Sequence, residues 1–122
     1  MDIEAKSLTF EEKLAAADDS IKAIYNEMCE ALEDKRVRGR ITKTSHNFTI
    51  KKVPLVKIRV MKKGLQMYFA LDPNDEKYAK VPHKDASDKK TYARTPFVFK
   101  VQSNLSVKRA KALIADILAS LD

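Results

Sequence analysis

The chain contains one cysteine, two glycines and no tryptophan. A single cysteine, Cys29, excludes an internal disulfide and a cysteine-based metal site, and it fits a reducing compartment. Two glycines are too few for a glycine-rich phosphate-binding loop. No apolar run reaches the roughly 20 residues that cross a bilayer, and the short, acidic start of the chain does not resemble a secretory leader. We therefore expect a cytoplasmic protein with no membrane association.

The composition is that of a folded globular chain. It has 122 residues, of which 44% are hydrophobic and 34% are charged. One hydrophobic core usually accounts for about 100 to 150 residues, and nothing in the sequence marks a linker or a repeat. We expect a single domain over residues 1–122.

The charge is distributed unevenly along the chain, although the formal net charge is only +7. Residues 1–34 carry ten acidic and three basic side chains, whereas residues 35–71 carry eleven basic side chains and no acidic one. Like charges at this density repel one another. Either a distant acidic element of the fold or a polyanionic partner is expected to cover them.

Hydrophobic periodicity predicts helices at both ends of the chain. Thr9-Phe10-Glu11-Glu12 has the form of a capping box, and Asp18-Asp19-Ser20 offers a second N-cap, so a brief helix should precede a longer one. The apolar positions of the longer helix follow a 3.6-residue period: Ile21, Ile24, Tyr25, Met28 and Leu32. A C-terminal helix, with Asn104 and Ser106 as capping candidates, carries a similar stripe from Val107 to Leu121.

Between the helices the period changes to 2, which indicates strands. Four strands are expected within residues 36–71, with turns at Ser45-His46 and at Lys62-Lys63-Gly64, and a fifth at Phe97, Phe99 and Val101. A short helix should run from Ser87-Asp88 to Tyr92. Aromatic side chains are expected to hold this helix and the preceding loop against the sheet, namely Tyr78, Tyr92, Phe97 and Phe99. The predicted fold is α+β: an antiparallel meander sheet of four to five strands, one face of which is covered by an N-terminal helical segment and a C-terminal helix.

The strand alternation places basic side chains on the uncovered sheet face. Arg36, Arg38 and Arg40 lie two residues apart, about 6 to 7 Å in a strand, which is close to the phosphate spacing of a nucleic acid. The same outward parity includes Lys51, Lys57, Arg59 and Tyr68. Guanidinium groups bind phosphate, and bases stack on tyrosine, so this face predicts a nucleic-acid-binding module. Two alternatives are a merely solvated face and an adaptor that binds an acidic protein surface, such as that of a second copy.

No catalytic motif is present, so we expect a non-enzymatic protein without a metal or another cofactor. The loop over residues 72–88 holds hard ligands, among them Asp72, His83 and Asp88, but their spacing matches no calcium or zinc pattern. Asp72 with Asp88-Lys89-Lys90 is similar to an arrangement in some metal-dependent nucleases. There the second group lies on an adjacent strand, whereas here Asp88 is expected to cap a helix. Cys29 adjoins the apolar helix stripe and is expected to be a packing residue.

Several strings together carry a family resemblance: Phe69-Ala70-Leu71-Asp72-Pro73, then Lys84 to Tyr92 and Thr95-Pro96, with Phe10 to Leu14, Arg40-Ile41 and Val107 to Lys111. Over about residues 10–114 the chain resembles a small domain of unknown function that is widespread in Firmicutes, sometimes in tandem copies. The resemblance implies a bacterial, intracellular protein and one compact unit, and it implies no activity. Members often carry a longer aromatic or glycine-arginine step where this chain has Lys51-Lys52-Val53-Pro54, so the basic surface is expected to be particular to this chain.

Overall fold

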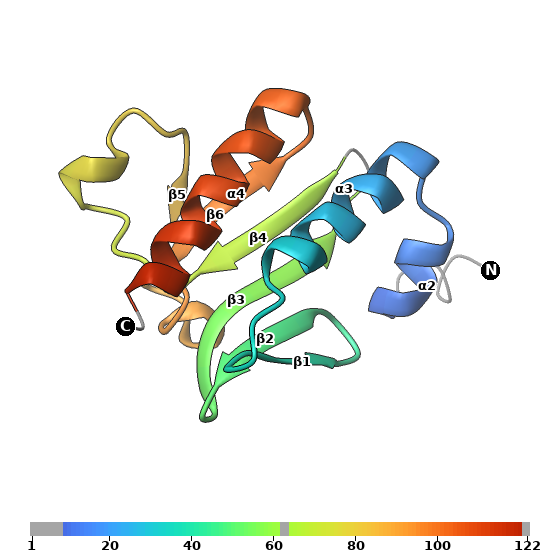
Figure 1. Ribbon diagram of the computed structural model, residues 1–122, viewed down its shortest axis with the longest axis horizontal. Helices are drawn as coiled ribbons and strands as arrows, with labels where there is room; N and C mark the ends of the chain where they lie inside the picture. Colours follow the sequence, from blue (N-terminus) through green and yellow to red (C-terminus); the bar gives the residue numbers. More distant parts are fainter. Residues whose placement is uncertain (1–8, 62–63, 121–122) are drawn as a thin grey trace.

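The computed structural model describes residues 9–61 and 64–120, which form two layers (Figure 1). One layer is an antiparallel sheet, and α3 and α4 lie across one of its faces. The elements in chain order are α2 (Phe10–Ala15), α3 (Asp19–Ala31), β1 (Arg38–Ile41), β2 (His46–Ile50), β3 (Val53–Val60), β4 (Leu65–Phe69), the 3-10 helix η1 (Glu76–Tyr78), β5 (Lys84–Asp85), the 3-10 helix η2 (Lys90–Tyr92), β6 (Phe97–Val101) and α4 (Asn104–Ala119). The predicted α+β architecture is confirmed.

The sheet order is β1-β2-β3-β4-β6-β5, and every neighbouring pair is antiparallel. The first four strands follow one another as hairpins. After β4 the chain passes to the far edge, forms β5, and returns so that β6 lies between β4 and β5. The described part of the chain thus has six strands rather than the expected four to five.

The N-terminal helices begin where the capping patterns indicate. The Glu12 amide donates to the Thr9 hydroxyl at 3.2 Å, and the Thr9 amide donates to the Glu12 carboxylate at 3.0 Å, which confirms the capping box. Asp18 occupies the N-cap position of α3, although its side chain makes no capping hydrogen bond. The predicted stripe of α3 faces the core, where Ile21, Met28 and Leu32 are buried.

The C-terminal helix closes the core against β6. Ser103 is its N-cap, one residue before the expected Asn104, and the Ser103 amide donates a hydrogen bond to the Ser106 hydroxyl at 2.8 Å. The last residue of the predicted stripe, Leu121, lies outside the described residues. In residues 9–61 and 64–120, no helix has both the length and the apolar character to span a membrane. The buried side chains of α4 are Val107, Ala110, Leu113, Ile114 and Ile117.

Local hydrogen bonds shift the predicted turn between the first two strands. The turn between β1 and β2 runs from Thr42 to Ser45, because the Thr42 amide donates to the Ser45 carbonyl at 2.8 Å and the Ser45 amide donates to the Thr42 hydroxyl at 3.2 Å. His46 is consequently the first residue of β2 rather than part of the turn. Of the predicted turn at the end of β3, Lys62 and Lys63 lie outside the described residues, whereas the Gly64 carbonyl accepts from the Met61 amide at 2.9 Å.

The turn between β2 and β3 offers a stability test. Ile50 pairs with Val53, so Lys51 and Lys52 form a two-residue turn, and their φ angles are 47° and 70°. Such turns favour Asn-Gly, because a Cβ resists the left-handed region. We expect the double variant Lys51→Asn, Lys52→Gly to raise the free energy of unfolding, measured by urea denaturation, by about 1 to 2 kcal/mol.

The matched control is Lys51→Ala with Lys52→Ala, which removes the same two charges but keeps both Cβ atoms in the left-handed region. Equal stabilisation of the two variants would attribute the gain to relieved charge repulsion and contradict the backbone explanation.

Candidate nucleic-acid interface

The face of the sheet opposite α3 and α4, here called the open face, carries one row of side chains in register across all six strands. Antiparallel partners point to the same face, so the pairing register defines the row. Adjacent strands are about 4.8 Å apart, which places the β1 and β3 members of the row about 10 Å from each other. The row consists of Arg40, Asn47, Lys57, Tyr68, Val98 and Lys84.

Arg38 and Arg40 occupy the outer end of the open face. Both are exposed, and they lie two residues apart on β1, an edge strand. Among the described residues neither arginine forms an ion pair. The acidic helix α3 lies on the other side of the sheet, so its carboxylates do not neutralise them. Together with their open-face neighbours they form the β1–β3 patch: Arg38, Arg40, Asn47, Thr49 and Lys57.

Two of the predicted interface residues lie elsewhere. Arg36 precedes β1 in a turn and is held by Asp34, with its Nη2 3.0 Å and its Nε 3.0 Å from the two carboxylate oxygens. These hydrogen bonds lower the pKa of Asp34 to about 2, so the pair persists at neutral pH. Lys51 was expected on β2, but it lies in the turn that follows. The alternating pattern thus extends beyond the strands: β1 begins after Arg36, and β2 ends before Lys51.

Tyr68 lies on the open face as its parity predicts, but it is only 3% exposed. The ring of Tyr92, from η2, stacks on it with 3.9 Å between centroids and 8° between planes. The Tyr92 hydroxyl accepts from Arg59 Nη1 at 3.0 Å, and Lys57 Nζ lies 5.4 Å from the centre of the Tyr92 ring. Tyr68 therefore cannot receive a base, and Arg59 is engaged within the protein.

The aromatic cover over β4 and β6 is a second, smaller apolar cluster on the open face. Tyr68, Ala86 and Val98 are its buried members, and Tyr92 packs against them. Tyr92 was expected, as an aromatic side chain, to hold the short helix to the sheet, but the sequence did not show that this contact closes the open face. The cover separates the β1–β3 patch from the exposed Lys84 and Lys100 at the far end of the open face.

A polar contact connects α3, in the helical layer, to β2. The Tyr25 hydroxyl lies 2.6 Å from His46 Nδ1, and the imidazole also packs on Phe48, with ring centroids 4.2 Å apart. Gly39 lies close to the opposite ring nitrogen, because a Cβ at this position would be 2.8 Å from Nε2. Burial lowers the pKa of His46 from its usual 6.5. His46 is thus enclosed by the core side of β1 and β2 and takes no part in the β1–β3 patch.

The His46 environment predicts a pH dependence of stability. As the pH falls through 6.5, the unfolded chain takes up a proton at His46 that the folded protein resists, because burial disfavours the imidazolium. The free energy of unfolding should therefore fall between about pH 7.5 and 5. The non-titrating variant His46→Gln should show a shallower fall in urea denaturation over the same range. Parallel curves for the two proteins would contradict this role of His46.

The loop between β4 and β6 is fixed by aromatic and carbonyl contacts. The His83 ring stacks on Phe97 with centroids 4.2 Å apart, and its nitrogens lie 2.6 Å from the carbonyl oxygens of Val81 and Pro73. Asp72 and Asp75 accept hydrogen bonds from nearby amides of the same loop. Over the described residues, no group of three or more His, Cys, Asp or Glu side chains could hold a metal ion.

Comparison with known proteins gives no match: no family model, no curated protein and no solved structure matches this chain. The resemblance to a Firmicutes domain of unknown function stays a prediction.

Proposed function

We propose that this protein binds nucleic acid through backbone phosphates on the β1–β3 patch. The observation that carries the proposal is the pair Arg38 and Arg40, which are exposed on one face, two residues apart, and without an ion-pair partner among the described residues. Guanidinium groups bind phosphate oxygens bidentately and keep their charge at any physiological pH. Their spacing suits successive phosphates of one strand.

The surroundings of the two arginines support the same partner. Residues 38–60 contain seven basic side chains and no acidic one, so nothing on β1 to β3 repels an anion. Asn47 and Thr49 add neutral hydrogen-bonding groups beside the arginines. Because Tyr92 covers Tyr68, base stacking contributes little in this conformation. Binding is then largely independent of base sequence, as expected for phosphate contacts.

The proposal is tested by fluorescence anisotropy with labelled single-stranded and duplex oligonucleotides at several salt concentrations. Affinity should fall steeply between about 50 and 200 mM salt, because counterions return to the phosphates. The double variant Arg38→Ala, Arg40→Ala should bind several-fold more weakly, and its log-log salt slope should be smaller by about 1 to 2. The unfolding midpoint should change little, since both side chains are exposed.

A matched variant, Lys22→Ala with Lys108→Ala, removes the same charge from α3 and α4 in the helical layer. It should keep the wild-type salt slope. Equal losses in the two double variants would mean that binding follows net charge alone and would refute the site. If an acidic protein is retained from nuclease-treated lysate by the wild type but not by the Arg38 and Arg40 variant, the patch instead serves an adaptor.

A further inference from the structure

The opposite edge of the sheet ends in an incomplete strand pairing. β6 has five residues, but β5 has only two and pairs only with Phe97 and Val98. From Phe99 onward, β6 is paired in the described structure on its β4 side alone. A continued β5 would place Pro82 opposite Lys100, and proline has no amide hydrogen to donate. The outer edge of β6 is thus open from the point where β5 ends.

The backbone of Lys100 faces this open edge. The Ala86 amide donates to the Pro96 carbonyl at 2.8 Å, so residue 96 directs its backbone groups towards β5. In an antiparallel ladder both backbone groups of a residue point to the same side, and the side alternates along the strand. The backbone N–H and C=O groups of Val98 and Lys100 therefore point to the outer edge of β6 as well. Among the described residues no backbone hydrogen bond joins Lys100 to another segment across this edge.

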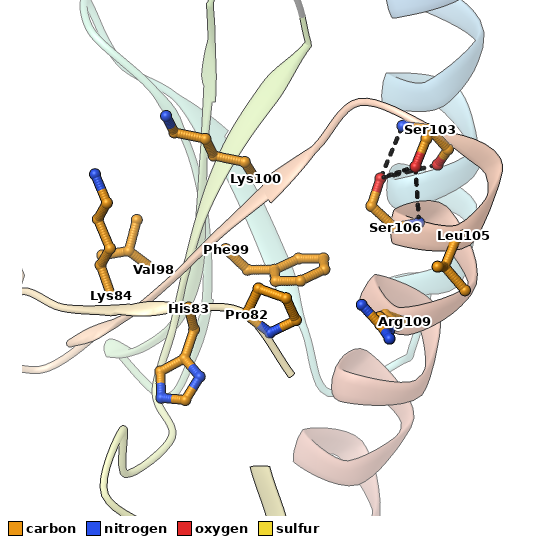
Figure 2. A pocket seen from close by; sticks show the side chains of 10 residues that line it. All are labelled: Pro82, His83, Lys84, Val98, Phe99, Lys100, Ser103, Leu105, Ser106 and Arg109. Carbon is orange, nitrogen blue, oxygen red and sulfur yellow. Dashed lines mark hydrogen bonds between the residues drawn. The ribbon is translucent and has the colours of Figure 1, made fainter. Parts of the chain in front are cut away.

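A groove of about 320 Å³ lies beside this edge, between β6 and the first turns of α4 (Figure 2). Its apolar part includes Pro82, Phe99 and Leu105, and Leu105 is 58% exposed. Figure 2 shows Phe99 directed towards α4, with Arg109 entering from the helix. Ser103 and Ser106 hydrogen-bond to each other in the N-terminal cap of α4. Ionic contacts with a ligand would therefore come from the basic side chains of the groove. The charged lining residues are Lys84, Lys100 and Arg109, and no acidic residue of the described part of the chain lines the groove.

We propose that this edge binds an extended peptide in which acidic and apolar residues alternate, as a strand added to β6. The free backbone groups of Lys100 would receive the peptide main chain, which is the usual basis of strand addition. A peptide residue opposite Lys100 shares its face, where a carboxylate meets the ammonium groups of Lys84 and Lys100. Its two neighbours point to the helix side, where apolar side chains pack against the exposed Leu105, beside the buried Phe99 ring.

The geometry distinguishes this ligand from other anions. A free phosphate would leave the apolar floor and the strand edge unused, and a nucleic acid offers no main chain for an antiparallel ladder. Arg109 lies on the helix side of the groove, where it can pair with a carboxylate at the end of the inserted segment. The site shares no residue with the β1–β3 patch, so either proposal can fail alone.

The test uses two labelled peptides of identical composition, Gly-Glu-Val-Glu-Val-Glu-Gly and the block arrangement Gly-Glu-Glu-Glu-Val-Val-Gly. In fluorescence anisotropy with the full chain, the alternating peptide should bind at least about 10-fold more tightly, because only alternation separates carboxylates and apolar side chains onto the two faces. It should also slow hydrogen exchange at the Lys100 amide. Equal affinities, or an unprotected Lys100 amide in the complex, would overturn the proposal.

Neighbouring residues of α4 supply matched variants. Arg109→Gln removes a groove charge, whereas Lys108→Gln removes the same charge from an exposed position that does not line the groove. Arg109→Gln should weaken binding of the alternating peptide by about 5-fold or more, and Lys108→Gln should leave it near the wild-type value. Equal effects would show attraction to the net charge alone and overturn the site. The Arg38→Ala, Arg40→Ala variant should still bind the peptide.

Discussion

Replacing Gly64 by alanine is expected to lower the free energy of unfolding by about 2 to 3 kcal/mol. A Cβ at this position would lie 2.3 Å from the Val101 carbonyl oxygen and 2.9 Å from Gln102 Cγ. The Val101 oxygen belongs to the backbone of β6, next to the ladder pair Leu65 and Val101. It cannot move away without disturbing the pairing of β4 with β6. Urea denaturation measures the loss.

The other glycine of the chain provides the matched control. A Cβ at Gly39 would meet only side chains, His46 Nε2 at 2.8 Å and Phe48 Cε2 at 3.3 Å, and these can shift. Gly39→Ala should therefore cost about 1 kcal/mol, clearly less than Gly64→Ala. If Gly39→Ala proved the more damaging change, the close backbone approach at Gly64 would not be what requires glycine there.

Removing the Tyr92 ring should change stability and binding in opposite directions. Tyr92→Ala deletes the stack on Tyr68 and the hydrogen bond from Arg59, which should lower the free energy of unfolding by about 1 to 3 kcal/mol. The same change uncovers Tyr68 and releases Arg59 beside Lys57. Because base stacking on an exposed ring contributes about 1 to 3 kcal/mol, single-stranded oligonucleotides should bind about 10-fold more tightly. Denaturation and fluorescence anisotropy measure the two effects.

The conservative variant Tyr92→Phe separates the contributions of ring and hydroxyl. It keeps the stack and loses only the hydrogen bond from Arg59, so binding to single strands should stay near the wild-type level. Weaker binding by Tyr92→Ala would contradict the account, since it would place Tyr92 itself in the interface and leave Tyr68 without a role.

Much of the fold could be predicted because its determinants are local. The Thr9 capping box, the 3.6-residue stripe of α3 and the alternation of β2 to β4 depend on neighbours within a few positions. β5 could not be predicted, since two residues carry no period and its pairing rests on the distant contacts of Ala86 and Pro96. Gly64 was predicted as a turn glycine, but its φ is not positive. Glycine is required at position 64 because the backbone there lies close to the Val101 carbonyl oxygen. A local sequence pattern does not contain this long-range contact.

The residues of the candidate site could likewise be predicted where local strand parity decides their position, and not where longer-range contacts do. Arg38, Arg40 and Lys57 could be placed on one face because strand parity has a fixed period of two. Arg36 and Lys51 were misplaced because the alternating pattern continues past the strand ends. The contacts of Arg36 with Asp34 hold it in a turn before β1, and the two-residue turn at Lys51-Lys52 ends β2. The cover of Tyr92 over Tyr68 joins residues far apart in sequence. An isolated tyrosine in a lysine-rich loop was its only signal.

The most direct test of phosphate binding on the open face is a titration of the isotope-labelled protein with a short single-stranded oligonucleotide, followed by amide NMR shifts. Shifts should concentrate on β1 and on the neighbouring positions of β2 and β3, from Arg38 to Arg40 and around Asn47 and Lys57, and fade as salt is raised. Amides of α3 and α4 should stay unchanged. Shifts confined to the helical layer, or none at low salt, would contradict the proposed interface.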